Sequence, residues 1–190
     1  MKHNLEDYIV KKSSFLENDF CDDTIFKIEE EKLKWDKHLW YDKLKKSLIS
    51  VNDDELDVLN NSKSDNTNII MEKLYNAILN YIHITNLPWF TSWNGYTGIR
   101  YNRYSMNQKM NLHCDHIHTI FDGQRKGIPT LSLLGSLNDN YEGGDLILFD
   151  DFKIELEKGD LIIFPSNFLY PHRVEPVISG VRYSYISWVW

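Results

Sequence analysis

The first part of the chain has the hydrophobic spacing of α-helices. Between residues 68 and 82, apolar side chains recur at i, i+4, i+7, i+8 and i+11, a single stripe that predicts an amphipathic helix packed on a core. An earlier helix is predicted to end near Lys32, because Cys21 and Ile28 also lie at helical spacing. The polar residues 17–19 precede its apolar positions and supply capping groups.

Two shorter segments of this first part break the helical pattern. Tyr8-Ile9-Val10 predicts a short strand near the start of the chain. Residues 52–67 are polar and rich in Asn, Asp and Ser, and they predict a short helix and a loop. The first part is therefore expected to be helical apart from one opening strand.

From Thr97 onward the pattern changes to a period of two, with frequent turn residues. The predicted strands are 98–104, 109–114, 130–137, 145–150, 152–157, 160–164, 172–177 and 181–189. Many short strands of this kind are typical of a double-sheet antiparallel jelly roll. We expect one domain over 1–190, mainly β, in which a helical support region at 1–96 packs its helices on one sheet of the core at 97–190.

Composition and charge narrow the class of protein. The chain has 190 residues, enough for a sizeable core, and its two Cys exclude a disulfide framework. Its net charge of −7 argues against a nucleic-acid partner, because phosphate binding needs basic side chains. Neither a signal peptide nor an apolar run long enough to span a membrane is predicted. We expect a cytoplasmic protein, and the pattern carries no signal for its oligomeric state.

One predicted strand carries two candidate metal ligands. Alternate residues of a strand share a face, so His113 and Asp115 project together. His172, at the start of a later strand, is the natural third ligand. Two imidazoles and one carboxylate leave coordination positions open, which suits iron(II) that binds a co-substrate and O₂. Taken alone, His-x-Asp is a weak signal, and His172 is equally consistent with a polar residue at a strand start.

A later strand carries an arginine in apolar surroundings. Arg182 stands among Val, Tyr and Ile, and an unpaired charge in that setting is costly. Ser184 shares its face by alternation, so the two side chains together would bind a ligand carboxylate with a bidentate fork and one further hydrogen bond. An internal salt bridge is the alternative.

Taken jointly, these residues resemble the 2-oxoglutarate/iron(II)-dependent oxygenases, most of all the prolyl hydroxylase-like branch. The order His113-x-Asp115, His172, Arg182 with Ser184 matches the family's pattern, and Tyr104 precedes His113 as in that branch. Further similar stretches are Phe15–Cys21, Asn138–Leu146, Lys158–Ser166, His172–Val177 and Gly180–Ser184. The resemblance covers residues 97–190 well and the first 96 loosely.

The resemblance implies a double-stranded β-helix with iron(II) at one open end. It implies His113, Asp115 and His172 as metal ligands and Arg182 as the partner of the distal carboxylate of 2-oxoglutarate. It also implies O₂ as co-substrate, ascorbate as a candidate reductant, and hydroxylation of an unactivated C–H with formation of succinate and CO₂. Ser184 and Tyr104 are then candidate hydrogen-bond donors to 2-oxoglutarate. Ser132 and Ser136 alternate inward on the strand 130–137 and are candidates to line the same pocket, with Trp188 as its wall or as a core aromatic.

The substrate expected from the resemblance is a prolyl or related residue of a peptide or protein, with a small molecule as an alternative. Residues 116–128 look like a lid loop beside the iron, or equally a solvated loop. Its cationic and imidazole side chains that could meet a substrate are His116, His118, Arg125 and Lys126. Three aromatic residues before the barrel are candidates either to line a groove or to bridge the helix and the sheet: Trp89, Trp93 and Tyr96.

Other functions compete with the hydroxylase. A jelly roll that binds a metal or ligand without turnover would keep the fold, but the intact ligand set argues against lost activity. A zinc-dependent hydrolase could use the same three ligands, but it gives Arg182 no role. Nucleic-acid demethylases of the family carry Asn and a second Arg after the distal His, and the segment Arg182–Trp188 lacks both.

Overall fold

The structure is a computed structural model that describes residues 4–31, 34–42, 44–45, 47–49, 54–87, 90, 93–115 and 129–190. Its helical elements are η1 (Leu5–Tyr8), α1 (Asn18–Glu30) and α2 (Asp65–Thr85). The strands of the first part are β1 (Val10–Lys12), β2 (Asp36–Lys37), β3 (Trp40–Asp42), β4 (Ser47–Ile49) and β5 (Asp57–Asn60). Those of the second part are β6 (Arg100–Tyr104), β7 (Met110–His113), β8 (Leu131–Ser136), β9 (Glu142–Gly143), β10 (Leu146–Leu148), β11 (Phe152–Ile154), β12 (Leu161–Pro165), β13 (His172–Val174), β14 (Val177–Ser179) and β15 (Arg182–Val189).

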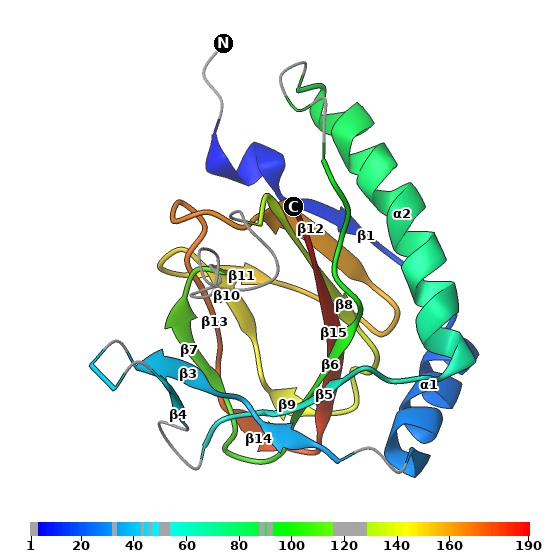
Figure 1. Cartoon of the computed structure of the whole chain (residues 1–190), viewed down its shortest axis with the longest axis vertical. Helices are drawn as coiled ribbons and strands as arrows, with labels where there is room; N and C mark the ends of the chain where they lie inside the picture. Colours follow the sequence, from blue (N-terminus) through cyan, green and yellow to red (C-terminus); the bar gives the residue numbers. More distant parts are fainter. Residues whose placement is uncertain are drawn as a thin grey trace.

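Two antiparallel sheets face each other and form the body of the molecule (Figure 1). The larger, seven-stranded sheet has the order β1-β12-β8-β15-β6-β5-β2, and the four-stranded sheet has the order β11-β10-β13-β7. The pairs β14-β9 and β3-β4 complete the strands of the described residues. This arrangement is a double-stranded β-helix, so the predicted mainly β jelly roll is confirmed.

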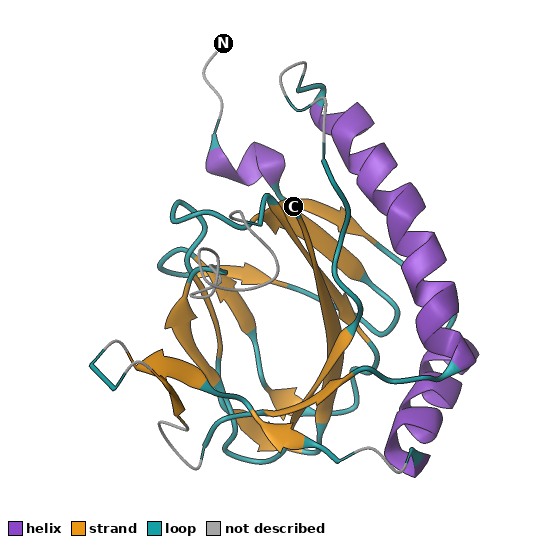
Figure 2. Ribbon diagram, viewed as in Figure 1, coloured by secondary structure: helices purple, strands orange, loops and turns teal. Residues whose placement is uncertain are grey.

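The helices cover the outer face of the large sheet, as predicted (Figure 2). Alternate residues of each strand point to opposite faces, which gives the large sheet two different cores. The outer core joins the stripe of α2 and part of α1 to Tyr101, Leu133 and Tyr185. The inner core, between the two sheets, contains Leu134, Phe164 and Leu148 among others.

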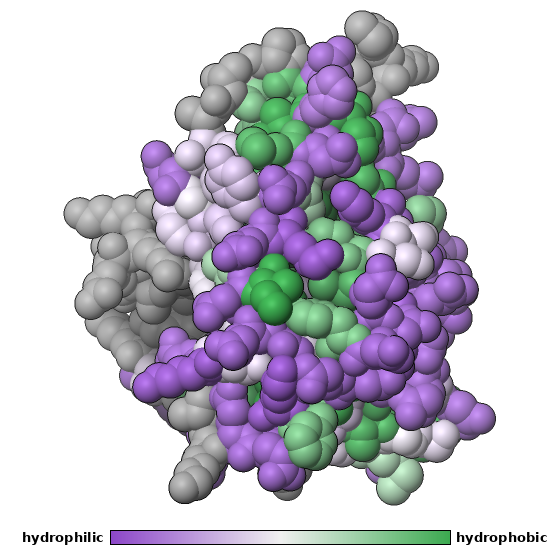
Figure 3. Space-filling view, turned by 90° about the vertical axis from the view of Figure 1, so that its right-hand side faces the viewer, coloured by the Kyte–Doolittle hydropathy of each residue, from purple (hydrophilic) through white to green (hydrophobic). Residues whose placement is uncertain are grey.

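The surface over the helices is mainly hydrophilic, with hydrophobic side chains in small separate patches (Figure 3). Exposed apolar residues of α2 include Leu79 and Ile84, which lie off the buried stripe. None of the helices in the described ranges is long and apolar enough to cross a membrane.

The predicted helices exist with shifted ends. The helix predicted over 68–82 runs from Asp65 to Thr85, because Ser64 accepts a hydrogen bond from the Asn66 backbone N–H and caps it earlier. The first helix ends at Glu30. The capping predicted from residues 17–19 is wrong, since the N-cap residue Glu17 makes no side-chain capping bond.

The prediction of a helical first part was wrong between the two helices. Residues 52–67 were expected to hold a short helix, but β5 occupies Asp57–Asn60 and pairs with β6, extending the large sheet. β2, β3 and β4 were also missed. The short strand expected at Tyr8–Val10 lies two residues later, at Val10–Lys12, and pairs with β12. β1 and β5 owe their structure to pairing with a distant strand, whereas β3 and β4 pair with each other.

The strands predicted after Thr97 exist with shorter bounds, except the one predicted over 160–164, which is shifted by one residue to Leu161–Pro165. The strand expected over 172–177 divides into β13 and β14, which belong to different sheets. β9 lies in the stretch that was assigned to a turn and pairs with β14.

Candidate metal and co-substrate site

The inner face of the small sheet brings two histidines together. His113 ends β7 and His172 begins β13, and the two are direct partners in the antiparallel pairing. Their ring centroids are 4.3 Å apart. Asp115 follows β7 by two residues, and its Oδ1 lies 3.4 Å from His113 Nε2 and 3.7 Å from His172 Nε2. The three residues therefore each offer one ligand atom within a cluster 4.8 Å across.

Hydrogen bonds fix the direction of both rings. His113 Nδ1 lies 2.7 Å from the carbonyl oxygen of Asn111, and His172 Nδ1 lies 3.1 Å from that of Tyr170. A carbonyl oxygen only accepts, so each Nδ1 carries the proton and donates it. Each Nε2 is left as a lone-pair ligand aimed at Asp115, which is the usual arrangement of metal-binding histidines.

Asp115 is held as a buried carboxylate. Burial alone would raise its pKa, but His172, His113 and the hydrogen bond from Ser132 together hold the pKa of Asp115 well below its usual range. Ser132 Oγ donates to Asp115 Oδ2 at 2.6 Å and lies 2.7 Å from Ser166 Oγ. Oδ1 is thereby left to face the histidines. Burial lowers the pKa of His172, which favours the neutral ring that a metal requires.

This donor set fits a divalent cation. A buried carboxylate converges with two neutral imidazole nitrogens, and no Lys or Arg in the described residues lies within 4.0 Å of that carboxylate. Two His and one carboxylate on one side of an ion are typical of iron(II) sites with open positions.

A second cluster lies on the seven-stranded sheet, which faces the sheet that carries the two histidines. Arg182 is 1% exposed, and its Nη1 donates to Ser184 Oγ at 3.2 Å. Its guanidinium carbon lies 5.0 Å from the ring centroid of Tyr104, its partner in the pairing of β15 with β6. Its Nε is buried without a hydrogen-bond partner in the described residues. The internal salt bridge considered for Arg182 is absent within that part of the chain.

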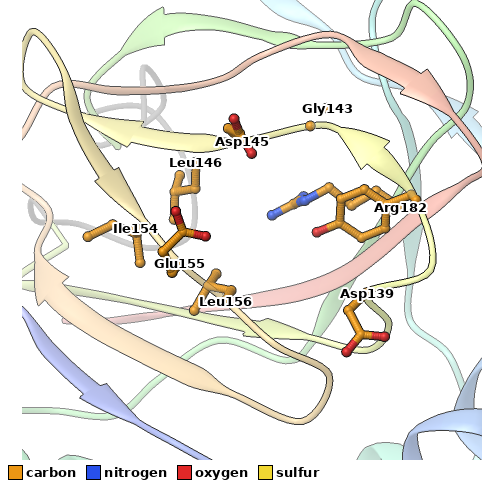
Figure 4. A pocket seen from close by; sticks show the side chains of 10 residues that line it. Asp139, Gly143, Asp145, Leu146, Ile154, Glu155, Leu156 and Arg182 are labelled. Atoms are coloured by element: carbon orange, nitrogen blue, oxygen red, sulfur yellow. The ribbon is translucent and has the colours of Figure 1, made fainter.

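Arg182 reaches into a cavity of about 190 Å³ (Figure 4). Asp145 and Glu155 also line this cavity, but Lys153 forms ion pairs with both. Gly144 leaves room for the arginine, because a Cβ at this position would lie 3.0 Å from Arg182 Cδ, and its φ of +63° also favours glycine. The cavity thus presents an unpaired cation that an anionic ligand can reach.

The other residues predicted for the co-substrate pocket, Tyr104, Ser184 and Ser136, lie near Arg182 in the strand pairing of the large sheet. Burial raises the pKa of Tyr104, although Arg182 opposes the shift, so the phenol keeps its proton and can donate. Ser184 accepts from Arg182 and retains its own proton for a ligand. Ser136 pairs directly with Ser184 across β8 and β15 but donates to the carbonyl oxygen of Asn138 at 2.9 Å. Its hydroxyl can therefore meet a ligand only as an acceptor unless that bond breaks.

The remaining predicted residues have mixed outcomes. Trp93 and Tyr96 bridge helix to sheet: Trp93 packs on Tyr75 of α2, and Tyr96 donates to the carbonyl oxygen of Met71. Trp188 lies against Arg100, 4.9 Å from ring centroid to guanidinium carbon. Residues 116–128, with His116, His118, Arg125 and Lys126, lie outside the described residues, as does Trp89.

Sequence reasoning missed several residues beside the cluster. Ser132 was expected to line the co-substrate pocket, but it holds Asp115 instead. Trp40 of β3 packs edge-on against His113 at 5.6 Å and donates to the buried Glu55 at 2.7 Å. No local pattern in the polar first part points to this contact. Arg100 was detectable, since it shares the strand face of Tyr104 by alternation.

The fold and the clusters define the class of protein, a double-stranded β-helix with a two-His, one-carboxylate centre. Residues 99–190 match the family model of the 2OG-Fe(II) oxygenase superfamily. A PKHD-type hydroxylase of Stenotrophomonas maltophilia is 36% identical over 95 residues, covering 47% of this chain. The match spans 41% of that relative, so the chain corresponds to about two fifths of its length.

Solved structures show the same fold over nearly the whole chain. The viral collagen prolyl hydroxylase of Paramecium bursaria Chlorella virus-1, in its 2OG complex, has a TM-score of 0.66 at 19% identity, covering 96% of this chain and 94% of that one. The Trichoplax adhaerens prolyl hydroxylase, in complex with a hypoxia inducible factor peptide, has a TM-score of 0.69 at 17% identity, covering 97% and 84%. The fold is therefore of the prolyl hydroxylase type.

Proposed function

We propose that this chain is a 2-oxoglutarate- and iron(II)-dependent dioxygenase that hydroxylates an unactivated C–H, in a prolyl or related residue of a peptide or protein. The observation that carries the proposal is the presence of two sites inside one barrel: a two-His, one-carboxylate cluster, and on the facing sheet a buried arginine without a carboxylate partner among the described residues. A zinc hydrolase would leave that arginine without a role. The similarity to PKHD-type hydroxylases and to the fold of prolyl hydroxylases supports the choice of substrate.

In this proposal His113, Asp115 and His172 hold the metal. Iron(II) bound there would supply the redox chemistry that couples O₂-dependent decarboxylation of 2-oxoglutarate to substrate hydroxylation, with ascorbate as its reductant. Ser132 keeps Oδ2 of Asp115 occupied, so that Oδ1 serves as the ligand atom. The backbone carbonyls behind each imidazole hold the two rings in place.

Arg182 binds the distal carboxylate of 2-oxoglutarate in a fork, with Ser184 and Tyr104 donating further hydrogen bonds. Charge-assisted bonds from the buried guanidinium orient the co-substrate toward the metal. Trp188, on the same face of β15, forms part of the wall on the side of the metal cluster.

The first test is succinate formation by the purified protein with iron(II), ascorbate and 2-oxoglutarate. Slow uncoupled turnover without a substrate is expected, together with a visible absorption band that depends on 2-oxoglutarate in the absence of O₂. A protein that binds metal but gives neither signal would be a silent module or a hydrolase, and the proposal would fail. A screen of peptides for a mass increase of about 16 Da would then identify the substrate.

The second test separates the two sites with Arg182→Gln. Truncating one partner of a buried charge pair weakens binding by about 2–5 kcal/mol, so the Kd of 2-oxoglutarate should rise roughly 30-fold or more. The affinity for Mn(II) without co-substrate should stay nearly the same. Because Arg182 has no carboxylate partner among the described residues, the free energy of unfolding should not fall. Arg173→Gln, which removes a surface arginine paired with Glu175, is the matched control.

Equal loss of metal and co-substrate binding in Arg182→Gln would contradict the role given to this arginine.

A further inference from the structure

The four arginines that the structure describes fall into two groups. Arg103 pairs with Glu29 at 3.0 Å and with Asp57 at 3.3 Å, and Arg173 pairs with Glu175 at 2.6 Å. Arg100 and Arg182 have no carboxylate oxygen within 4.0 Å in the same ranges. The unpaired arginines lie on the inner face of the large sheet, in a chain with an excess of acids. Arg182 is explained by 2-oxoglutarate, but Arg100 needs another explanation.

Arg100 is held with part of its guanidinium unused. Its Nε donates to Asn102 Oδ1 at 3.1 Å, and its guanidinium carbon stacks over Trp188 at 4.9 Å. The two Nη atoms make no hydrogen bond to any described residue, and the side chain is only partly exposed. One nitrogen and one flat face are thus fixed, and the two Nη groups, which no described residue engages, have the fork geometry that suits a carboxylate.

The strand register places Arg100 between the two clusters. Arg100 pairs with Ile186, which pairs with Leu134, and the next inward row is Trp188 with Ser132. Ser132 holds Asp115, so Arg100 lies one row, about 7 Å, from the row that contacts the metal cluster. On the other side, Arg182 and Tyr104 lie two rows away. The charge of Asp115 acts on Arg100 over this distance.

Among the described residues, no acidic side chain forms an ion pair with Arg100. In the proposed enzyme, the charges of iron(II), Asp115, Arg182 and doubly negative 2-oxoglutarate cancel. Glu55, another buried acid of this region, accepts from Trp40 and lies beside His38, and it makes no ion pair with Arg100. Burial lowers the pKa of Arg100, yet a guanidinium remains cationic at neutral pH. A carboxylate of the substrate would supply the direct partner that Arg100 lacks among the described residues.

We propose that Arg100, backed by Trp188, binds a carboxylate of the substrate, so that the substrates are peptides with an acidic residue directly beside the residue that is hydroxylated. The inference rests on the proposed function and narrows its substrate class. Arg100 lies one strand row from the row that contacts the metal cluster, and this short separation favours an acidic residue that directly neighbours the target. A peptide's own terminal carboxylate is a second source of the same chemistry.

The test is affinity selection with the protein loaded with Mn(II) and 2-oxoglutarate, which needs no turnover. A pool of capped peptides with a central Pro and varied neighbours is applied, and the retained peptides are identified by mass spectrometry. A charge-assisted pair should enrich Asp and Glu beside Pro over Asn and Gln by about 10- to 100-fold. Arg100→Gln should lose this enrichment, and Arg100→Glu should instead favour Lys and Arg.

Arg103→Gln is the matched control, because it removes the same charge from the same strand on the opposite face. It should keep the selection for acidic neighbours. A parallel pool of peptides with free C-termini distinguishes an acidic side chain from a terminal carboxylate as the group that Arg100 binds. If only peptides with a free C-terminus beside Pro are retained, Arg100 binds the terminal carboxylate. Thermal melts of each variant confirm that it is folded.

Two results would overturn the inference. One is that the wild type does not enrich peptides with acidic neighbours, or retains no peptide at all. The same conclusion follows if Arg100→Gln enriches acidic neighbours as strongly as the wild type does. The other is a loss of 2-oxoglutarate affinity in Arg100→Gln as large as that in Arg182→Gln, which would make Arg100 a co-substrate residue. Succinate formation separates failure of this inference from failure of the proposed function. If the protein forms succinate but does not select acidic peptides, only the inference about Arg100 fails. If it selects acidic peptides through Arg100 but forms no succinate, only the proposed oxygenase activity fails.

Discussion

The two faces of the seven-stranded sheet have opposite chemistry although they come from the same strands. On β8, Leu131 and Leu133 point toward the helices, whereas Ser132 and Ser136 point into the barrel. On β15, Tyr185 packs under the helices, and Arg182 and Ser184 face the inner cavity. One face gains free energy from burial of apolar area, and the other keeps polar groups in place for a ligand.

The comparison teaches where stability and function separate. The outer face binds nothing in the proposed mechanism, so changes there should act on folding alone. The inner face includes a buried arginine with an unpaired Nε, which costs stability in the free protein. Changes on that face should act on metal, co-substrate or substrate with small effects on folding.

The largest effect is expected from Leu133→Ala on the outer face. Leu133 is fully buried, and truncation of a buried Leu costs about 2–5 kcal/mol of the free energy of unfolding. Urea unfolding measures this loss, and the Mn(II) affinity of the folded protein should be unchanged. Leu79→Ala on the exposed side of α2 is the control, with a change within about 0.5 kcal/mol. A large loss of metal affinity in Leu133→Ala would remove the distinction between the faces.

A smaller effect is expected from Ser132→Ala on the inner face. Loss of the bond to Oδ2 lets Asp115 rotate, and removal of such a supporting hydrogen bond costs about 10- to 100-fold in metal affinity. Mn(II) titration without co-substrate measures it. Ser136, on the same strand face, donates to the carbonyl oxygen of Asn138 and not to Asp115. The control Ser136→Ala should therefore leave the Mn(II) affinity unchanged. The same affinity in both variants would show that Asp115 does not depend on Ser132.

The smallest effect concerns His38, which lies beside Glu55 and Trp40 at the edge of the inner face. Burial lowers the pKa of His38, partly opposed by Glu55 and reinforced by the charges of Arg100 and His113. Below pH 6.5 the unfolded chain therefore binds a proton that the folded chain does not, and stability falls as pH falls from about 6.5 toward the folded pKa. His38→Asn should remove up to about 1 kcal/mol of this loss between pH 7.5 and 5.5 in urea unfolding, whereas His83→Asn, on an exposed position of α2, should not. Identical pH profiles for wild type and His38→Asn would contradict this.

Much of the second part was predictable from the sequence. Alternation placed Arg182 with Ser184 on one strand face and located the strands to within a few residues, because a half-buried strand must repeat every two residues. The jelly roll was predicted from the many short strands, and its type from the resemblance. The helix stripe that ends at Tyr81 likewise predicted the layer on the large sheet.

Tertiary structure alone decided the rest. The β5 segment was predicted as helix and loop because its strand structure depends on pairing with β2 and β6, both distant in the sequence. Nothing local predicts that Ser132 holds Asp115, that Trp40 packs on His113, or that Arg103 is neutralised while Arg100 is not. The local hydrophobic period determines which face of a strand a side chain takes. The partner of that side chain is set by strand pairing across the barrel. The partner in turn determines whether a charged side chain is neutralised within the protein or can bind a ligand.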